Sequence, residues 1–150
     1  MIDTSMTTRT PWHLWVVGVL SLLWNGYGGY DFIRTTTQGE AYMRSAGFDQ
    51  AMIDYFNAMP AWMYVPWTLG VWGAVIGSIL LLIRNRLAVW AFALSLLGAV
   101  VSLIYGQFIN PPPALPAGLE MMSYMPWVIT AVAAFLAWYA WVMAKKGVLR

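Results

Sequence analysis

The sequence predicts an all-α, polytopic membrane protein, a bundle of four transmembrane helices with a short amphipathic outer-side helix between the first and second. Of its 150 residues, 61% are hydrophobic and 9% are charged, whereas a soluble domain carries about a quarter charged residues. Each of four stretches without Asp, Glu, Lys or Arg could cross a hydrocarbon layer of about 30 Å, which takes about 20 helical residues. These stretches are Thr10–Tyr30, Tyr55–Ile83, Leu87–Leu119 and Met121–Ala144.

Prolines and turn residues set the expected ends of the four helices. The first runs from Pro11 to Ile33, because proline suits a first helical position where its missing N–H would be unpaired anyway. We interpret it as a retained helix rather than a signal peptide, since no A-x-A cleavage pattern follows. The other three span residues 61–83, 87–109 and 123–144, and the short turn Arg84-Asn85-Arg86 makes the second and third an antiparallel hairpin. All four are needed by one bundle, so we expect a single domain over residues 1–150.

The segment Arg34–Asn57 is the only sizeable stretch expected outside the membrane. Its Thr37-Gln38-Gly39-Glu40 has the spacing of a capping box, which predicts a short helix through Met43. A second helix is expected in Asp49–Met59, where apolar residues recur every three or four positions, an amphipathic pattern suited to a membrane surface or to the ends of the bundle. Two roles stay open for this segment, a structural cap and a gate or docking surface.

The basic residues predict the orientation of the bundle. Six of them fall on one predicted side, Arg9, Arg84, Arg86, Lys145, Lys146 and Arg150, and two on the other, Arg34 and Arg44. Loops rich in Lys and Arg stay in the cytoplasm. The sequence therefore predicts a multi-pass membrane protein with both termini cytoplasmic.

Composition excludes several kinds of chemistry. The chain has no cysteine and a single histidine, His13, so a cysteine-based metal site, an iron–sulfur cluster and a multi-histidine site are excluded. The net charge of +2 is too small and scattered to favour nucleic acid. No catalytic motif such as GxSxG, Walker A, HExxH or GxGxxG occurs. We therefore expect no enzyme activity, no cofactor and no metal.

Small residues predict where helices pack closely. In lipid, small side chains let two backbones approach, which replaces the hydrophobic drive available in water. Internal packing and a homodimer contact are both consistent with such faces. The expected packing residues are Gly70, Gly73, Gly77, Ser95 and Gly98.

The segment Trp24-Asn25-Gly26-Tyr27-Gly28-Gly29-Tyr30-Asp31 holds the few polar residues of the first span. Its three glycines weaken a helix, and unwound backbone at membrane depth occurs only where it is buried in protein or lines a wet cavity. We expect either a helix that unwinds around a ligand or a helix that frays at the interface with Asp31 in solvent. The candidate ligand-binding residues are Trp24, Asn25, Tyr27, Tyr30 and Asp31.

The chain resembles a group of small, functionally uncharacterised bacterial inner-membrane proteins, mostly from proteobacteria, whose members often carry the automatic label "sugar transporter". The resemblance rests on the opening motif Pro-Trp-His-Leu-Trp-Val-Val-Gly-Val-Leu-Ser-Leu-Leu-Trp-Asn-Gly from Pro11 and on Gly39-Glu40-Ala41-Tyr42-Met43. It continues in Met59-Pro60-Ala61-Trp62, in Leu69–Ala74 and in Ala91–Gly98, and covers about two-thirds of the chain. It implies four helices in the inner membrane; the label is not evidence of transport.

Two classes of function remain. The first is transport or binding of a small neutral, sugar-like solute around the polar break in the first helix. The alternative is a non-catalytic accessory or assembly subunit of a larger membrane complex, which small size and scarce intramembrane charge favour, since ionisable groups usually mark ion pathways. The expected partners are the lipid bilayer and either further copies of the chain or a larger complex.

Overall fold

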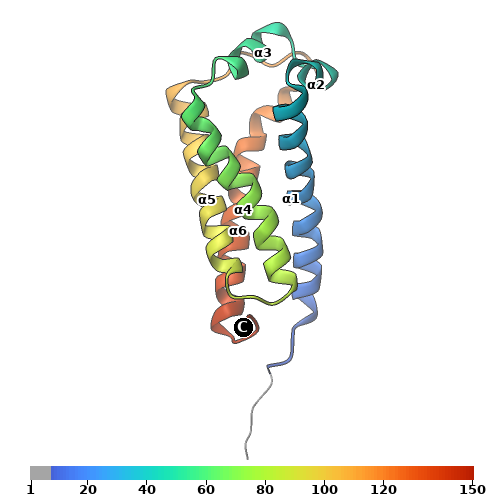
Figure 1. Cartoon of the computed structure of the whole chain (residues 1–150), viewed down its shortest axis with the longest axis vertical. Helices are drawn as coiled ribbons and strands as arrows, with labels where there is room; N and C mark the ends of the chain where they lie inside the picture. The colour runs from blue at the N-terminus through green and yellow to red at the C-terminus, as the bar shows by residue number, and fades with distance from the viewer. Residues whose placement is uncertain (1–7) are drawn as a thin grey trace, which may run out of the picture.

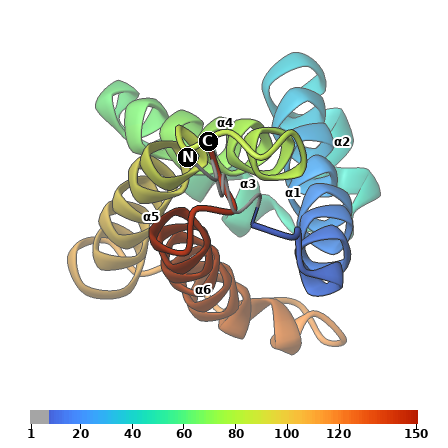
Figure 2. The same cartoon turned by 90° about the horizontal axis from the view of Figure 1, so that it is seen from below.

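The computed structural model describes residues 8–150 and is all-helical, with no strand among these residues (Figures 1 and 2). The all-α prediction is therefore confirmed; residues 1–7 of the predicted domain lie outside the described residues. The long helices are α1 (Trp12–Gln38), α4 (Tyr64–Leu82), α5 (Ala88–Ile104) and α6 (Met125–Lys145). The short ones are α2 (Glu40–Ser45), α3 (Gln50–Asn57), η1 (Ala61–Met63), η2 (Tyr105–Ile109) and η3 (Glu120–Tyr124).

The four long helices lie side by side, and the two ends of the bundle differ (Figure 1). At one end, here the cap end, α2 and α3 lie across the long helices. At the other, the terminal end, lie the start of α1, the turn between α4 and α5, and the C-terminus. Seen along the bundle, α4 lies between α1 and α5, and α6 packs on α5 (Figure 2).

Within residues 8–150, three helical stretches are long and apolar enough to cross a membrane: Ala61–Leu82, Ala88–Ile109 and Glu120–Lys145. They correspond to the second, third and fourth predicted spans. The helix α1 has the length, with 27 residues, but it is less apolar than the other three because its cap-end half carries Asn25, three glycines and two tyrosines.

Glycines bring α4 and α5 into close contact. A Cβ atom on Gly98 would lie 2.3 Å from the carbonyl oxygen of Pro66 and 2.6 Å from the nitrogen of Gly70. On the other helix, a Cβ on Gly73 would lie 3.0 Å from the oxygen of Ala91, and one on Gly77 would lie 2.8 Å from the ring of Phe92. Glycine at these positions is what allows the backbones to approach.

Ser95 completes this contact. Its hydroxyl donates to the carbonyl oxygen of Gly70 at 2.6 Å, across the two helices. The structure thus places all five expected packing residues in the contact between α4 and α5, inside one chain.

The main apolar core lies toward the terminal end. Leu14 from α1, Leu81 from α4 and Phe92 from α5 are fully buried there against α6. The imidazole Nδ1 of His13 also lies 2.5 Å from the Tyr139 hydroxyl, which joins α1 to α6. The buried residues of α6 run from Ala133 to Met143, so its first two turns are exposed.

The glycine-rich segment of α1 neither unwinds nor frays, and this corrects both expectations for it. The helix continues without a break through Gly26, Gly28 and Gly29 to Gln38, five residues beyond the predicted end at Ile33. Gly29 packs on α4, where a Cβ would meet Val75 at 3.5 Å. The helical hydrogen bonds of this segment and its packing on α4 outweigh the modest preference of glycine for coil.

The helical stretches of the other three spans end within three residues of the predicted positions, but they include irregular turns. The second and fourth spans begin with 3-10 turns, η1 and η3. The third ends in a π-helical turn, where the nitrogen of Asn110 donates to the oxygen of Tyr105 at 2.8 Å. Such a wider turn ends the helix immediately before Pro111, which cannot donate a backbone hydrogen bond.

The segment over the bundle, Glu40–Asn57, forms two short helices and is called the cap from here on. The predicted capping box is wrong: Gly39 rather than Thr37 precedes α2, because α1 runs on to Gln38 and the Thr37 hydroxyl donates to Ile33 of its own helix at 2.6 Å. The second predicted helix is present as α3, and its first turn is capped by Asp49, which accepts from the nitrogen of Met52 at 3.0 Å.

Candidate functional site

Asn25, the most polar residue expected in the first span, lies in the contact between α1 and α4. It is 8% exposed, and its amide Nδ2 donates to the hydroxyl of Ser78 at 2.9 Å and to the carbonyl oxygen of Ala74 at 3.3 Å. The Ser78 hydroxyl in turn donates to Ala74 at 2.8 Å. Polar side chains that bond across helices in this way hold membrane helices together. The position of Asn25 is explained by packing.

The three aromatic residues expected beside Asn25 point away from it. Trp24, Tyr27 and Tyr30 are exposed on the outer face of α1, and Tyr27 is 68% exposed. The rings of Tyr27 and Tyr30 lie 6.4 Å apart, one turn from each other. These side chains therefore cover the outside of the helix and do not enclose a ligand with Asn25.

Asp31, the last expected site residue, bonds to the cap. Its carboxylate Oδ1 accepts from the Tyr42 hydroxyl at 2.7 Å. The guanidinium of Arg34 lies over the ring of Tyr42 at 5.3 Å and over the ring of Tyr30 at 5.6 Å, within cation–π range. This cluster fixes α2 against the end of α1. The structure thus brings Asp31 and Tyr30 together through Arg34 and Tyr42 and separates both from Asn25.

The hydrogen bond to Asp31, with burial as a lesser cause, raises the pKa of Tyr42 from 10.0 to about 12. The folded chain holds this proton more tightly than the unfolded chain, so the bond stabilises the fold below about pH 10, and this contribution is lost as the pH rises toward 12. We expect the ultraviolet titration of the wild type minus that of Tyr42→Phe to show one phenol near pH 12. In Asp31→Asn the same difference should move toward pH 10; an unmoved titration would contradict the assignment of the bond.

A cavity of about 220 Å³ lies at the cap end, where α1, α2, α3 and α4 meet. Aromatic rings and neutral polar groups line it together, and none of its lining side chains is charged. The lining residues are Thr35, Thr36, Gly39, Met43, Phe56, Asn57, Met59, Tyr64 and Trp67. None of the five predicted site residues is among them.

The aromatic wall of this cavity is held in place by the bundle beneath it. Trp67 packs edge-on against Phe32 of α1, with ring centroids 4.7 Å apart, and lies 5.8 Å from the ring of Tyr64. Phe56 stacks on Phe48 at 5.9 Å within the cap. A ring whose position is fixed by its neighbours is preorganised for stacking.

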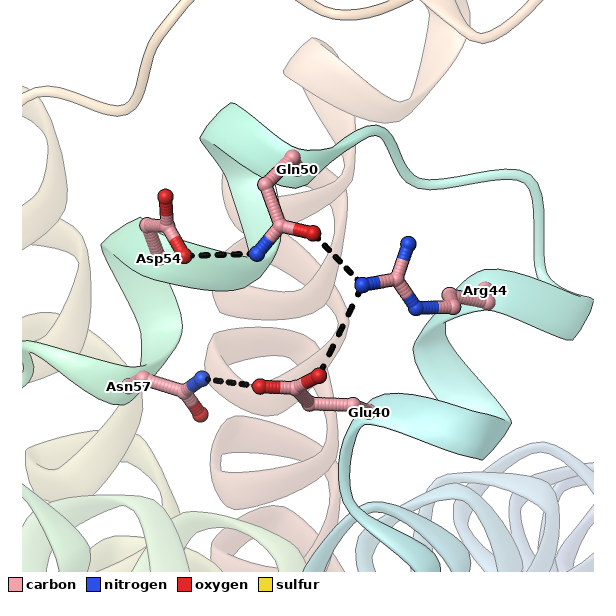
Figure 3. Close-up of polar contacts among 5 residues, drawn as sticks. All are labelled: Glu40, Arg44, Gln50, Asp54 and Asn57. Carbon is pink, nitrogen blue, oxygen red and sulfur yellow. Dashed lines mark hydrogen bonds and ion pairs between the residues drawn. The ribbon is translucent and has the colours of Figure 1, made fainter.

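A chain of polar contacts joins the two helices of the cap beside the cavity (Figure 3). Asn57 donates from Nδ2 to Glu40 at 3.0 Å, and the Glu40 carboxylate lies 3.6 Å from the Arg44 guanidinium. Arg44 donates to Gln50 at 2.5 Å, and Gln50 donates to Asp54 at 2.7 Å. Each exposed contact is worth little by itself, but together they join α2 to α3 and orient the Asn57 amide.

These groups suit a small, neutral and polar ligand. The Asn57 amide donates to Glu40 and keeps its oxygen as an acceptor. The Thr36 hydroxyl donates to Phe32 at 2.8 Å, so its lone pairs are also acceptors. Aromatic rings offer an apolar face to the C–H groups of such a ligand. Drug-sized ligands occupy about 300–1,000 Å³, so a molecule of monosaccharide size is the upper limit here.

The residues of this cavity come from parts of the chain that are distant in sequence. The predicted first helix ends at Ile33, before Thr35 and Thr36, and only the continuation of α1 to Gln38 brings them opposite Asn57 and Trp67. The one local signal was the amphipathic pattern of Asp49–Met59, which contains Phe56 and Met59.

No protein-family model, no curated protein and no solved structure matches this chain. The resemblance to the small inner-membrane proteins therefore stays a prediction.

Proposed function

We propose that the chain is a multi-pass protein of the bacterial inner membrane in which α1 spans the bilayer together with α4, α5 and α6. The length of α1 and its packing along α4 support this topology, since α1 runs parallel to three helices apolar enough to span. The polar side chain of Asn25 is turned toward α4, and large apolar residues cover the outer face of α1. We propose the cytoplasm for both termini, because the six basic residues named above belong to the terminal end.

This topology predicts the outcome of thiol labelling. The chain has no cysteine, so single cysteines report cleanly on their own surroundings. In intact cells, Ala46→Cys and Ala117→Cys, both exposed at the cap end, should react with a membrane-impermeant reagent. Thr8→Cys, exposed before α1, should react only after the cells are opened. Labelling of Thr8→Cys alone in intact cells would reverse the orientation.

We further propose that the chain binds a small, neutral, sugar-like solute in the cavity between the cap and the long helices, with no catalytic step. The observation that carries this proposal is an uncharged lining in which a Trp, a Tyr and a Phe ring lie with the Asn57 amide and two threonines. Polar groups in an otherwise apolar pocket orient a ligand and select for it. The proposal keeps the predicted ligand class, but the lining of the site begins at Thr35, about one helical turn beyond Asp31.

Binding is better supported than passage through the bundle. The path along α1 toward the terminal end is filled by the Asn25–Ser78 contact and by the core around Leu14 and Phe92. A solute could continue past Asn25 only if α1 separated from α4. Transport by this chain would therefore require a second conformation or additional copies.

Equilibrium binding to the purified chain in detergent tests the proposal. The probes are glucose, ribose and mannitol, with glucuronate and glucosamine as charged analogues. Saturable binding of at least one neutral probe is expected, with weaker binding of the charged analogues, because no lining side chain carries a charge that could pair with theirs. Equal binding of charged and neutral probes, or no saturable binding of any neutral probe, contradicts the proposal.

An accessory subunit of a larger membrane complex is the second candidate. The observation that favours it is the outer face of α1, where a Cβ on Gly26 or Gly28 would meet nothing within 4 Å. Gly26 and Gly28 lie on either side of Tyr27, whose ring is exposed together with those of Trp24 and Tyr30. A helix of another protein could pack there. Recovery of a stoichiometric partner by crosslinking from Gly26→Cys, together with failure of every solute probe, would favour this role.

A further inference from the structure

Positive charge is concentrated at the terminal end of the bundle. Arg84 and Arg86 lie in the turn between α4 and α5, and Lys145, Lys146 and Arg150 follow from the end of α6. The five acidic residues of the described chain, Asp31, Glu40, Asp49, Asp54 and Glu120, all belong to the cap end or its loops. The basic residues of the terminal end therefore have no carboxylate side chain within the described chain to neutralise them.

The C-terminal segment folds back and braces this turn. The nitrogen of Arg150 donates to the carbonyl oxygen of Arg84 at 2.7 Å, and the nitrogen of Arg86 donates to the oxygen of Arg150 at 2.9 Å. Val148 and Leu149 are buried in the core. These two backbone hydrogen bonds bring Arg84, Arg86 and Arg150 together although Arg150 is distant from the other two in sequence.

Arg84 is held in a conformation that costs energy. Its φ of 60° is in the left-handed region, where a residue with a side chain is uncommon. Its guanidinium Nε donates to the carbonyl oxygen of Val148 at 3.1 Å, which fixes the group, whereas its Nη2 is buried without a hydrogen-bond partner among residues 8–150. A buried charged donor without an acceptor is unfavourable. An anion at this guanidinium would supply the missing acceptor.

We propose that Arg84, Arg86 and Arg150 form a binding site for the phosphate group of an anionic phospholipid. A guanidinium pairs with phosphate oxygens through two parallel hydrogen bonds, and the turn presents three guanidinium-bearing residues from two segments. The site lies at the end of membrane-spanning helices, at headgroup depth, where a basic cluster attracts anionic lipids. The inference rests on the proposed membrane location, but not on solute binding at the cap.

Native mass spectrometry of the detergent-solubilised chain tests the site with phosphatidylglycerol and phosphatidylcholine of the same acyl chains. The wild type should retain phosphatidylglycerol preferentially. Arg84→Gln should weaken this retention by about fivefold or more, the effect expected for one basic residue at an anionic surface. The matched control is Arg44→Gln, which removes an arginine at the cap end and should leave retention unchanged.

Two further measurements keep the proposal falsifiable. If Arg84→Gln does not fold, Arg86→Gln and Arg150→Gln keep the buried guanidinium and should each weaken retention by a similar factor. Inorganic phosphate that displaces the lipid at equal concentration would identify a soluble phosphate as the ligand and overturn the assignment to lipid. Equal retention of the two lipids, or equal loss in the Arg44→Gln control, would show that no specific site exists. In detergent the orientation of the chain in a membrane plays no part, and the solute cavity lies at the other end of the bundle. A negative result here is therefore independent of the topology and solute experiments.

Discussion

Replacing Gly98 by alanine is expected to destabilise the folded chain by about 1–3 kcal/mol, at the upper end of this range for overpacking. The new methyl group would lie 2.3 Å from the carbonyl oxygen of Pro66 and 2.6 Å from the nitrogen of Gly70. Both obstacles are backbone atoms of α4, so no side chain can rotate away and α5 must shift. The midpoint of thermal or denaturant unfolding in detergent measures the effect.

The matched control is Gly26→Ala, in the middle of α1. A methyl group there would meet nothing within 4 Å, and the residue lies in a regular helix. Alanine exceeds glycine in helix propensity by about 1 kcal/mol, so this variant should be as stable as the wild type or slightly more stable. Similar losses in both variants would mean that the contact between α4 and α5 is not the tight one described above.

Replacing Trp67 by alanine is expected to weaken binding of the best neutral solute probe by about 30-fold or more, the effect of removing a central aromatic anchor of about 2 kcal/mol. Trp67 forms the aromatic wall of the cavity and is positioned by Phe32. Without the indole ring, the solute loses the apolar face against which it would stack. Isothermal titration of the wild type and the variant measures the change.

Two variants separate the loss of stacking from a loss of stability. Trp90→Ala removes an indole that is 71% exposed on α5, far from the cavity lining, and should bind the probe as the wild type does. Trp67→Phe keeps an aromatic ring and should retain part of the affinity. Unchanged binding in a folded Trp67→Ala variant would place the solute elsewhere.

The sequence predicts most of the fold because membrane helices are encoded by long local stretches. The charge-free runs located α4, α5 and α6 to within about a turn, and Asp49 and the amphipathic spacing after it located α3. The small residues Gly70, Gly73 and Gly98 were recognisable because close helix contacts require them. The ends of the helices were less predictable: whether Thr37 caps α2 or continues α1 depends on tertiary contacts that no local pattern contains.

The candidate site was far less predictable, because a polar residue in a largely apolar helix has two explanations that look alike in sequence, a ligand site and a packing contact. Asn25 satisfies a packing contact through Ser78, a partner 53 positions away. The three glycines near it predict a break in the helix, but α1 remains helical through all three. The cavity in the structure is lined by Thr36, Asn57 and Trp67. These residues form no recognisable motif in the sequence and come together only in the folded chain.

Protection of a single cysteine in the cavity by solute is the measurement that tests the central claim most directly. Thr36→Cys and Thr37→Cys are adjacent, both exposed, and both hydroxyls bond to carbonyls of the same helix, but only position 36 lines the cavity. With the best-binding neutral probe at saturation, the rate of thiol labelling should fall at position 36 and stay constant at position 37. If the two rates respond equally to the solute, or neither responds, the cavity beneath the cap is not its binding site.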